Sequence, residues 1–191
     1  MYKIITTCFL LILVACNNSK KSDSPAGKDD TTTAKTTNTT TATGPEQFLE
    51  ELRNLAPLGS DELKAKLPAT IMGAAVTDAE YNESMGAGLV TGQYVVSDSS
   101  KITINIYDCA GDGGAGVYNM QYTNMIDVKI ENENDYTKPI TIGGVKGYEQ
   151  CQKQSNDCSI TWFAGKRFLV SMESENISAG ELIAEAKKIS F

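Results

Sequence analysis

Residues 93–108, QYVVSDSSKITINIYD, decide the fold class of this 191-residue chain. Two apolar arms flank residues 98–100, and the sequence DSS at that point is typical of a tight turn, so the stretch predicts a β-hairpin. In the second arm Ile102, Ile104 and Ile106 alternate with polar residues. One buried face and one polar face are typical of an antiparallel sheet. The stretch therefore predicts an antiparallel β-sheet in the fold.

Four more apolar runs follow further along the chain, separated by glycines and by a polar loop. Tight glycine turns such as Gly143-Gly144 between apolar runs predict consecutive antiparallel strands. The runs are KPITI (138–142), VKGYEQC (145–151), CSITWFAG (158–165) and KRFLVSME (166–173). Together they predict a four-strand meander.

Two short helices are expected before the hairpin. Pro45 suits a first helical turn, and the apolar residues that follow it have helical spacing. These apolar residues are Phe48, Leu52 and Leu55. We expect Ser60 to cap the second helix, which must end before Pro68 because proline disfavours a helical residue in front of it.

Two further helices complete the pattern. One lies between the hairpin and the meander, and the other, at the end of the chain, begins with the capping-box sequence SAGE at 178–181. The apolar positions of the two helices are Ala115, Tyr118, Tyr122 and Met125, and Leu182, Ile183, Ala186 and Ile189. The predicted class is α+β, with an antiparallel sheet (hairpin plus four-strand meander) flanked by helices.

The N-terminus, MYKIITTCFLLILVAC, has the pattern of an export signal. Lys3 precedes an apolar run of about eleven residues, which suits a signal peptide and is too short to span a bilayer. The run ends in residues 13–16, LVAC, which resemble a bacterial lipobox. That resemblance implies cleavage before Cys16 and lipidation of its thiol. The alternative is an ordinary secretory signal with a chance cysteine.

These patterns divide the chain into three parts. Residues 1–15 are a lipoprotein signal peptide, residues 16–44 are the lipidated cysteine and a Thr-rich disordered tether, and residues 45–191 are a single α+β domain. The tether contains no sizeable apolar residue, so it cannot offset the entropy of ordering. We expect a protein of the cell envelope that is held to the membrane through Cys16. Asn17 favours the outer membrane, with its periplasmic face and its outer surface both open.

Composition excludes several classes of function. The formal net charge is −7 and the pI is about 4.7, which argues against nucleic-acid binding. The chain contains no histidine, so catalytic triads with histidine and the common histidine-based zinc sites are excluded. No cofactor and no metal are predicted.

The glycine loop at residues 111–116, GDGGAG, matches G-x-G-x-x-G after a strand and before a helix. A dinucleotide-binding loop needs a parallel β-α-β context, whereas the sequence predicts antiparallel neighbours. Asp112 would also repel a phosphate. The simpler interpretation is a structural turn in which Gly111, Gly113 and Gly114 permit positive φ and Asp112 caps the helix.

Three cysteines belong to the domain. Cys151 ends one meander strand and Cys158 begins the next, so we predict a disulfide between them in an oxidising envelope. Cys109 then remains unpaired, as a small buried residue. Two weaker alternatives are a zinc site built from the three cysteines and an aspartate, and a cation site in the acidic loop ENEND at 131–135.

The aromatic residues of the meander have two interpretations. They belong to the core of the sheet, or they line a ligand pocket. These residues are Trp162, Phe163 and Phe168.

Residues 60–191 resemble an uncharacterised family of bacterial exported and lipid-anchored proteins. The similarity covers most of the domain and depends on structural motifs. These are Leu67-Pro68, Gly73, Ile104, Ile106, Asp108, Gly111, Gly147-Tyr148, the run 165–170 (GKRFLV) and Glu181-Leu182. The element order is also similar to that of Mog1/PsbP-type sandwiches, which is a likeness of fold alone. The resemblance implies no catalytic residues, and the pair Cys151 and Cys158 departs from its pattern.

The sequence thus predicts a non-enzymatic envelope lipoprotein, a tethered module that binds an envelope protein or surface ligand or has a structural role. The alternative is an enzyme or cofactor-binding protein that uses the glycine loop 111–116 or Cys109. A deep cleft that contains Cys109, Asp108 and Asp112 together would favour this alternative.

Overall fold

The structure is a computed structural model that describes residues 45–191. The signal peptide predicted at 1–15 and the tether predicted at 16–44, with Cys16, lie outside the described residues. The helical segments are α1 (Pro45–Arg53), α2 (Ser60–Lys64), α3 (Gly111–Val117), the π-helical segment η1 (Tyr118–Thr123) and α4 (Ala179–Ala186). The strands are β1 (Thr70–Ile71), β2 (Ala74–Ser84), β3 (Ala87–Ser97), β4 (Ser100–Asp108), β5 (Ile130–Glu131), β6 (Asp135–Ile142), β7 (Val145–Gln152), β8 (Cys158–Ala164) and β9 (Phe168–Glu175).

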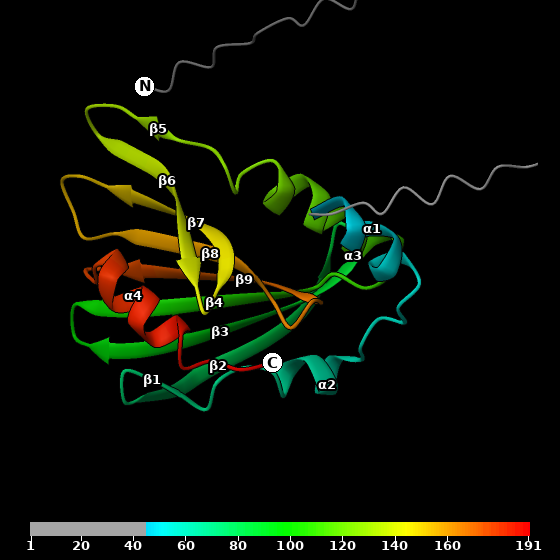
Figure 1. Cartoon of the computed structure of the whole chain (residues 1–191). Helices are drawn as coiled ribbons and strands as arrows, with labels where there is room; N and C mark the ends of the chain where they lie inside the picture. Colours follow the sequence, from blue (N-terminus) through cyan, green and yellow to red (C-terminus); the bar gives the residue numbers. More distant parts are fainter. Residues whose placement is uncertain (1–44) are drawn as a thin grey trace, which may run out of the picture. The chain divides into compact units, whose positions relative to one another are not determined.

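The nine strands described form one antiparallel sheet with the order β1-β2-β3-β4-β9-β8-β7-β6-β5 (Figure 1). The predicted hairpin is β3–β4, and the predicted meander is β6–β9, as the register of each pair confirms. The two units join where β4 pairs with β9. The α+β class with an antiparallel sheet and flanking helices is therefore confirmed.

Three strands were not predicted. β1 and β5 have two residues each and exist through pairing with longer neighbours. β2 is an edge strand with mostly exposed side chains, so it lacks a clear alternating pattern. The β3–β4 turn also differs from the prediction, because Ser100 already pairs with Ser97 and leaves only Asp98 and Ser99 in the turn.

One face of the sheet carries an aliphatic core beneath α4. Ile102, Ile104 and Ile106 on β4 all have exposed fractions of 0 % and belong to this core, together with Leu182 and Ala186 of α4. The predicted capping box begins α4, since the Ser178 hydroxyl oxygen accepts a hydrogen bond from the Glu181 N–H and the Glu181 carboxylate accepts one from the Ser178 N–H. Burial of this apolar face therefore holds α4 on the sheet.

The other hydrophobic cluster lies under α1, α3 and η1. In Figure 1 these segments gather at the opposite end of the sheet from α4. Leu52 and Cys109, both 0 % exposed, belong to this cluster with Tyr118, Tyr122 and Phe163. The molecule thus has two clusters, one mainly aliphatic and one rich in aromatic rings.

Two predicted helix caps are wrong by one or two positions. Ser60 is the first residue of α2, and Gly59 is its N-cap. The Gly59 N–H donates to the Glu62 carboxylate at 3.0 Å, so the acidic side chain caps the turn in place of a serine. In α3 the N-cap is Ala110, and Asp112 lies inside the first turn. None of the helices described for residues 45–191 is long and apolar enough to cross a membrane.

Candidate functional site

The glycine loop forms the start of α3, and its glycines act by close packing more than by unusual dihedral angles. Gly111 has φ +74°, whereas Gly113 and Gly114 are helical, contrary to the prediction of positive φ at all three. A Cβ atom on Gly114 would lie 2.6 Å from the Asp108 carbonyl oxygen. A Cβ atom on Gly113 would lie 2.9 Å from the Gly86 Cα. The glycines therefore let α3 contact the β2–β3 turn and the end of β4 directly.

The sheet around this loop differs from a dinucleotide-binding fold. β4 leads into the loop, and both of its neighbours, β3 and β9, run antiparallel to it. The parallel neighbour of a β-α-β unit is thus absent beside β4. The Asp112 side chain is 96 % exposed and lies 3.9 Å from the Arg53 Nε atom. Asp112 therefore points to solvent, and the helix-capping role predicted for it is wrong.

Asp108 at the end of β4 forms a buried ion pair with Arg167. Its side chain is 0 % exposed, and its Oδ1 and Oδ2 atoms accept hydrogen bonds from Arg167 Nε and Nη2 at 2.7 and 2.9 Å. The carboxylate also accepts from the Leu58 N–H at 2.7 Å and the Ala110 N–H at 3.2 Å. The hydrogen bonds that Arg167 donates to Asp108 raise the pKa of the Arg167 guanidinium. This pair joins β4, the β8–β9 turn and the α1–α2 loop.

Cys109 follows Asp108 and is a free, buried cysteine, as predicted. Burial raises the pKa of its thiol to about 12, so the thiolate needed for nucleophilic chemistry is disfavoured. Asp108 and Cys109 are inside the protein, while Asp112 is in solvent. The three side chains thus share no cleft.

The predicted disulfide is present between Cys151 and Cys158. The two residues stand directly opposite each other on β7 and β8, with a Cα–Cα distance of 4.2 Å. In the acidic loop 131–135, Glu131 instead pairs with Lys153, whose ammonium lowers the pKa of the carboxyl group. Residues 45–191 contain no group of three or more cysteine or acidic side chains that could hold a metal ion.

A pocket lined mainly by aromatic and aliphatic side chains lies beside η1, at the edge of the aromatic cluster. It has a volume of about 640 Å³, within the range typical of small-molecule sites. We call it the aromatic pocket. Its lining residues are Phe48, Tyr118, Tyr122, Ile126, Asp127, Val145, Lys146, Phe163, Gly165 and Lys166. It is therefore built by α1, η1 and two turns of the meander.

Four aromatic rings form the wall of this pocket. The Phe163 ring centroid lies 4.5 Å from that of Tyr118, 5.8 Å from that of Tyr122 and 5.6 Å from that of Phe48. Tyr118 and Tyr122 are themselves 5.4 Å apart and tilted. Such tilted pairs are favourable ring arrangements and stabilise the wall before any ligand arrives.

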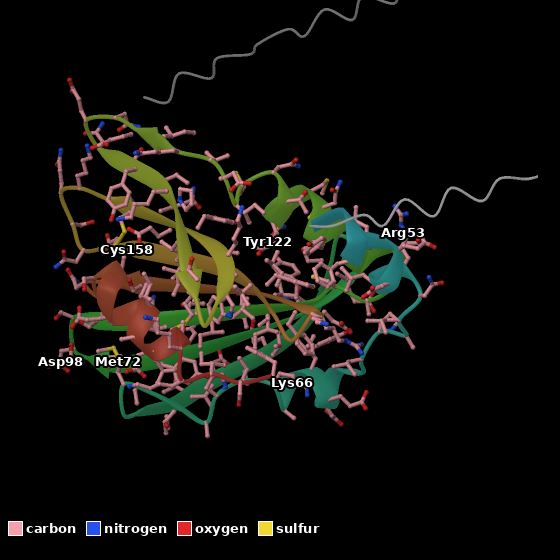
Figure 2. All side chains as sticks on the ribbon, in the orientation of Figure 1. Arg53, Lys66, Met72, Asp98, Tyr122 and Cys158 are labelled. Carbon is pink, nitrogen blue, oxygen red and sulfur yellow. A yellow bond between two sulfur atoms is a disulfide. The ribbon has the colours of Figure 1, made fainter. Side chains whose placement is uncertain are left out.

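The π-helical turn η1 is anchored to the sheet by tyrosine hydroxyls. The Tyr122 hydroxyl donates to the Lys146 carbonyl oxygen at 2.7 Å, and the Tyr148 hydroxyl donates to the Gln121 carbonyl oxygen at 3.1 Å. Burial raises the pKa of Tyr122 to about 12, so its hydroxyl stays protonated and keeps donating in alkaline solution as well. Figure 2 shows Tyr122 between the helical segments and the strands. π-helical turns are rare and often mark functional sites.

Charged residues surround the mouth of the pocket. Lys146 Nζ lies 3.0 Å from Asp127 Oδ1, so these two charges offset each other. Lys166 is exposed in the β8–β9 turn and takes part in none of the ion pairs found within residues 45–191. The mouth thus carries one positive charge that no carboxylate neutralises, on a chain with net charge −7.

The sequence identified only part of this site. Of the three aromatic residues weighed as core or pocket, Phe163 lines the pocket, while Trp162 and Phe168 belong to the aliphatic cluster. Phe48, Tyr118 and Tyr122 were recognised as helical positions without a role in a pocket. The sequence feature that could have indicated the pocket is the pair Tyr118 and Tyr122, which lie four residues apart on one face of a predicted helix.

Comparisons with known proteins found no relative, so the site is interpreted from its own geometry. The chain matches no protein-family model, no curated protein and no solved structure.

Proposed function

We propose that this protein is a cell-envelope lipoprotein, anchored at Cys16 in the outer membrane, whose domain is a non-enzymatic binding module. The observation that carries the proposal is the lipobox-like sequence LVAC at 13–16, which ends an apolar run of signal-peptide length. The Cys151–Cys158 disulfide supports an oxidising compartment. The aromatic pocket supports a binding role over a purely structural one.

The relationship to exported, lipid-anchored proteins is part of the same proposal and is based on sequence motifs alone. The buried ion pair joins Asp108 and Arg167, two residues that the resemblance singled out for no chemical reason. A Mog1/PsbP-like sandwich remains our proposal for the fold family. Its support is the antiparallel sheet with helices packed over both hydrophobic clusters.

The competing function is an enzyme or cofactor-binding protein that uses the glycine loop or Cys109. Two observations weigh against it. The loop is packed against the Gly86 backbone, and the Cys109 thiol is buried with a raised pKa. Titration with NAD, NADP and FAD tests this competitor, and a micromolar affinity that an Asp112→Ala substitution strengthens would favour it, because Asp112 would repel the phosphates of a bound dinucleotide.

Anchoring is tested by Cys16→Ser in cells fed radiolabelled palmitate. The substitution should abolish incorporation and move the protein from the membrane fraction to the soluble fraction, because acyl chains contribute roughly 0.8 kcal/mol of membrane affinity per buried CH₂. Cys8→Ser, in the apolar run of the same leader, is the matched control and should leave labelling unchanged. Equal labelling of wild type and Cys16→Ser would rule out the lipoprotein assignment.

A further inference from the structure

We infer that the aromatic pocket binds an amphiphile with an apolar body and an anionic head, such as a long-chain carboxylate. The inference rests on the binding role proposed above and names the ligand class. The interior of the pocket is mainly apolar, because aromatic and aliphatic side chains form most of its lining and the Tyr122 hydroxyl already donates to the Lys146 carbonyl oxygen. Every buried side-chain nitrogen and oxygen in residues 45–191 has a hydrogen-bond partner. A polar ligand body would therefore lose its water without gaining new partners.

The aromatic wall suits an apolar ligand body. The Phe163 ring centroid lies 5.6 Å from that of Phe48 and 5.8 Å from that of Tyr122, so these rings form a surface before a ligand binds. A preformed surface lowers the entropy cost of association. The volume of about 640 Å³ is large enough for a chain or ring system of drug-like size.

The mouth selects the sign of the ligand's head group. Lys166 lies at the exposed mouth and forms no ion pair within the described chain, whereas Lys146 is engaged by Asp127. The Lys166 ammonium attracts an anionic head group and repels a cationic one. Of the two lysines that line the pocket, Lys166 is therefore the one that remains to meet an anionic head.

The test titrates the mature chain (residues 16–191 with Cys16→Ser), produced without its signal peptide and purified without detergent, with sodium laurate below its micelle concentration. Dodecyltrimethylammonium, with the same chain and the opposite charge, is the matched probe. We expect laurate to bind with micromolar affinity and the cation to bind at least about tenfold more weakly. Palmitate labelling of the wild type tests lipid anchoring separately. A failure of the anchoring proposal can therefore be told apart from a failure of the ligand inference.

Isoleucine methyl groups report where laurate binds. Ile126 lines the pocket, whereas Ile104 is fully buried in the aliphatic cluster. In spectra of the methyl-labelled protein, the Ile126 signal should shift along the laurate titration while the Ile104 signal stays in place. A shift of Ile104 alone would place the ligand elsewhere and overturn the inference.

Two pairs of substitutions separate charge selection from the apolar wall. Lys166→Glu should weaken laurate binding about tenfold, and Lys187→Glu, an exposed lysine outside the pocket, should change it by less than about twofold. Phe48→Ala removes one ring and should also weaken binding about tenfold, while Leu55→Ala just beyond α1 should not.

The outcomes are decisive in both directions. Laurate binding that shifts Ile126 and is weakened by Lys166→Glu and Phe48→Ala supports the inference. Absence of laurate binding, equal affinity for the two probes, or indifference to both substitutions overturns it. Circular dichroism of each variant shows whether a loss of binding comes with a loss of fold, and Phe48→Leu, which keeps an apolar side chain, then replaces Phe48→Ala.

Discussion

The two hydrophobic clusters of this protein are held together in different ways. The aliphatic cluster packs α4 on alternating β-branched side chains such as Ile102 and Ile104, and a side-chain capping box begins that helix. The aromatic cluster holds three short helical segments, and neither α3 nor η1 has a side-chain cap. Close glycine contacts and one buried ion pair take the place of caps there.

The difference agrees with the binding role that we propose for the aromatic side of the molecule. On the aliphatic side, short-range sequence patterns specify the helix cap and the alternating apolar residues, and these residues form a closed core. On the aromatic side, contacts between distant segments position a rare π-helical turn and leave a pocket open beside it. Features that local rules do not explain are the ones expected at functional sites.

The largest effect should come from breaking the ion pair that joins the aromatic side to the sheet. Arg167→Ala leaves the Asp108 carboxylate, 0 % exposed, without its counter-charge, and should destabilise the fold by about 3–5 kcal/mol. Urea denaturation followed by circular dichroism measures this. Lys101→Ala, which removes an ion pair with an exposed glutamate on β9, should cost less than about 1 kcal/mol. Equal costs for the two would contradict the role given to Asp108.

The next effect separates two glycines of one helix. Gly114→Ala places a Cβ atom 2.6 Å from the Asp108 carbonyl oxygen and 2.7 Å from the Cys109 Cα, both backbone atoms, and should cost about 3 kcal/mol. Gly116→Ala meets nothing within 4 Å and should instead stabilise the protein by about 0.5–1 kcal/mol, because alanine is the better helix former. Thermal melting of both variants checks the opposite signs, and two destabilised variants would argue against close packing as the reason for Gly114.

The two clusters also differ in how far the sequence predicted them. The aliphatic side was predictable because it follows local rules: the alternation at Ile102–Ile106 and the capping box at Ser178 both have short-range signals. β2 was missed because an exposed edge strand carries little alternation.

For the aromatic side, the sequence predicted the helices and strands but not how their side chains meet. Phe48 and Phe163 are more than a hundred positions apart in the sequence, so no local pattern indicates that their rings meet. Asp112 was given the capping role on sequence pattern, but the helix begins one residue earlier in the chain, at Gly111. The close packing of Gly113 against Gly86 depends in the same way on tertiary structure.

The disulfide tests the aliphatic side. Replacing Cys151 and Cys158 together by alanine should cost about 2–3 kcal/mol, because the bridge restricts the unfolded chain and closes a short loop. Reducing agent should lower the stability of the wild type by a similar amount and leave the double variant unchanged. Labelling of the unfolded, unreduced protein should find Cys109 as the single free thiol of residues 45–191. Wild-type stability that is insensitive to reducing agent would contradict the bridge.

The smallest expected effect is a pH-dependent loss of stability that is caused by the Cys109 thiol. It tests whether this thiol is as buried in the aromatic cluster as the structure indicates. The pKa of the thiol is raised from 9.0 to about 12 in the folded state, mainly by burial. A raised pKa contributes stability that is complete below the unfolded value and is lost as the pH rises toward the folded value. Between pH 8 and pH 10 the unfolded chain releases this proton and the folded chain keeps it. The wild type should therefore lose about 1.4 kcal/mol more than Cys109→Ala over this interval.

Parallel urea titrations of the two proteins at pH 8, 9 and 10 measure this difference. All tyrosines are common to both proteins, and Tyr118 is the one whose pKa Cys109 itself helps to raise. Cys151 and Cys158 are bridged in both and do not titrate. A constant stability gap across the three pH values would mean that the Cys109 thiol ionises as readily in the folded protein as in the unfolded chain. That result would reopen the use of Cys109 as a nucleophile, since a thiolate at the base of the glycine loop is what the enzymatic alternative requires.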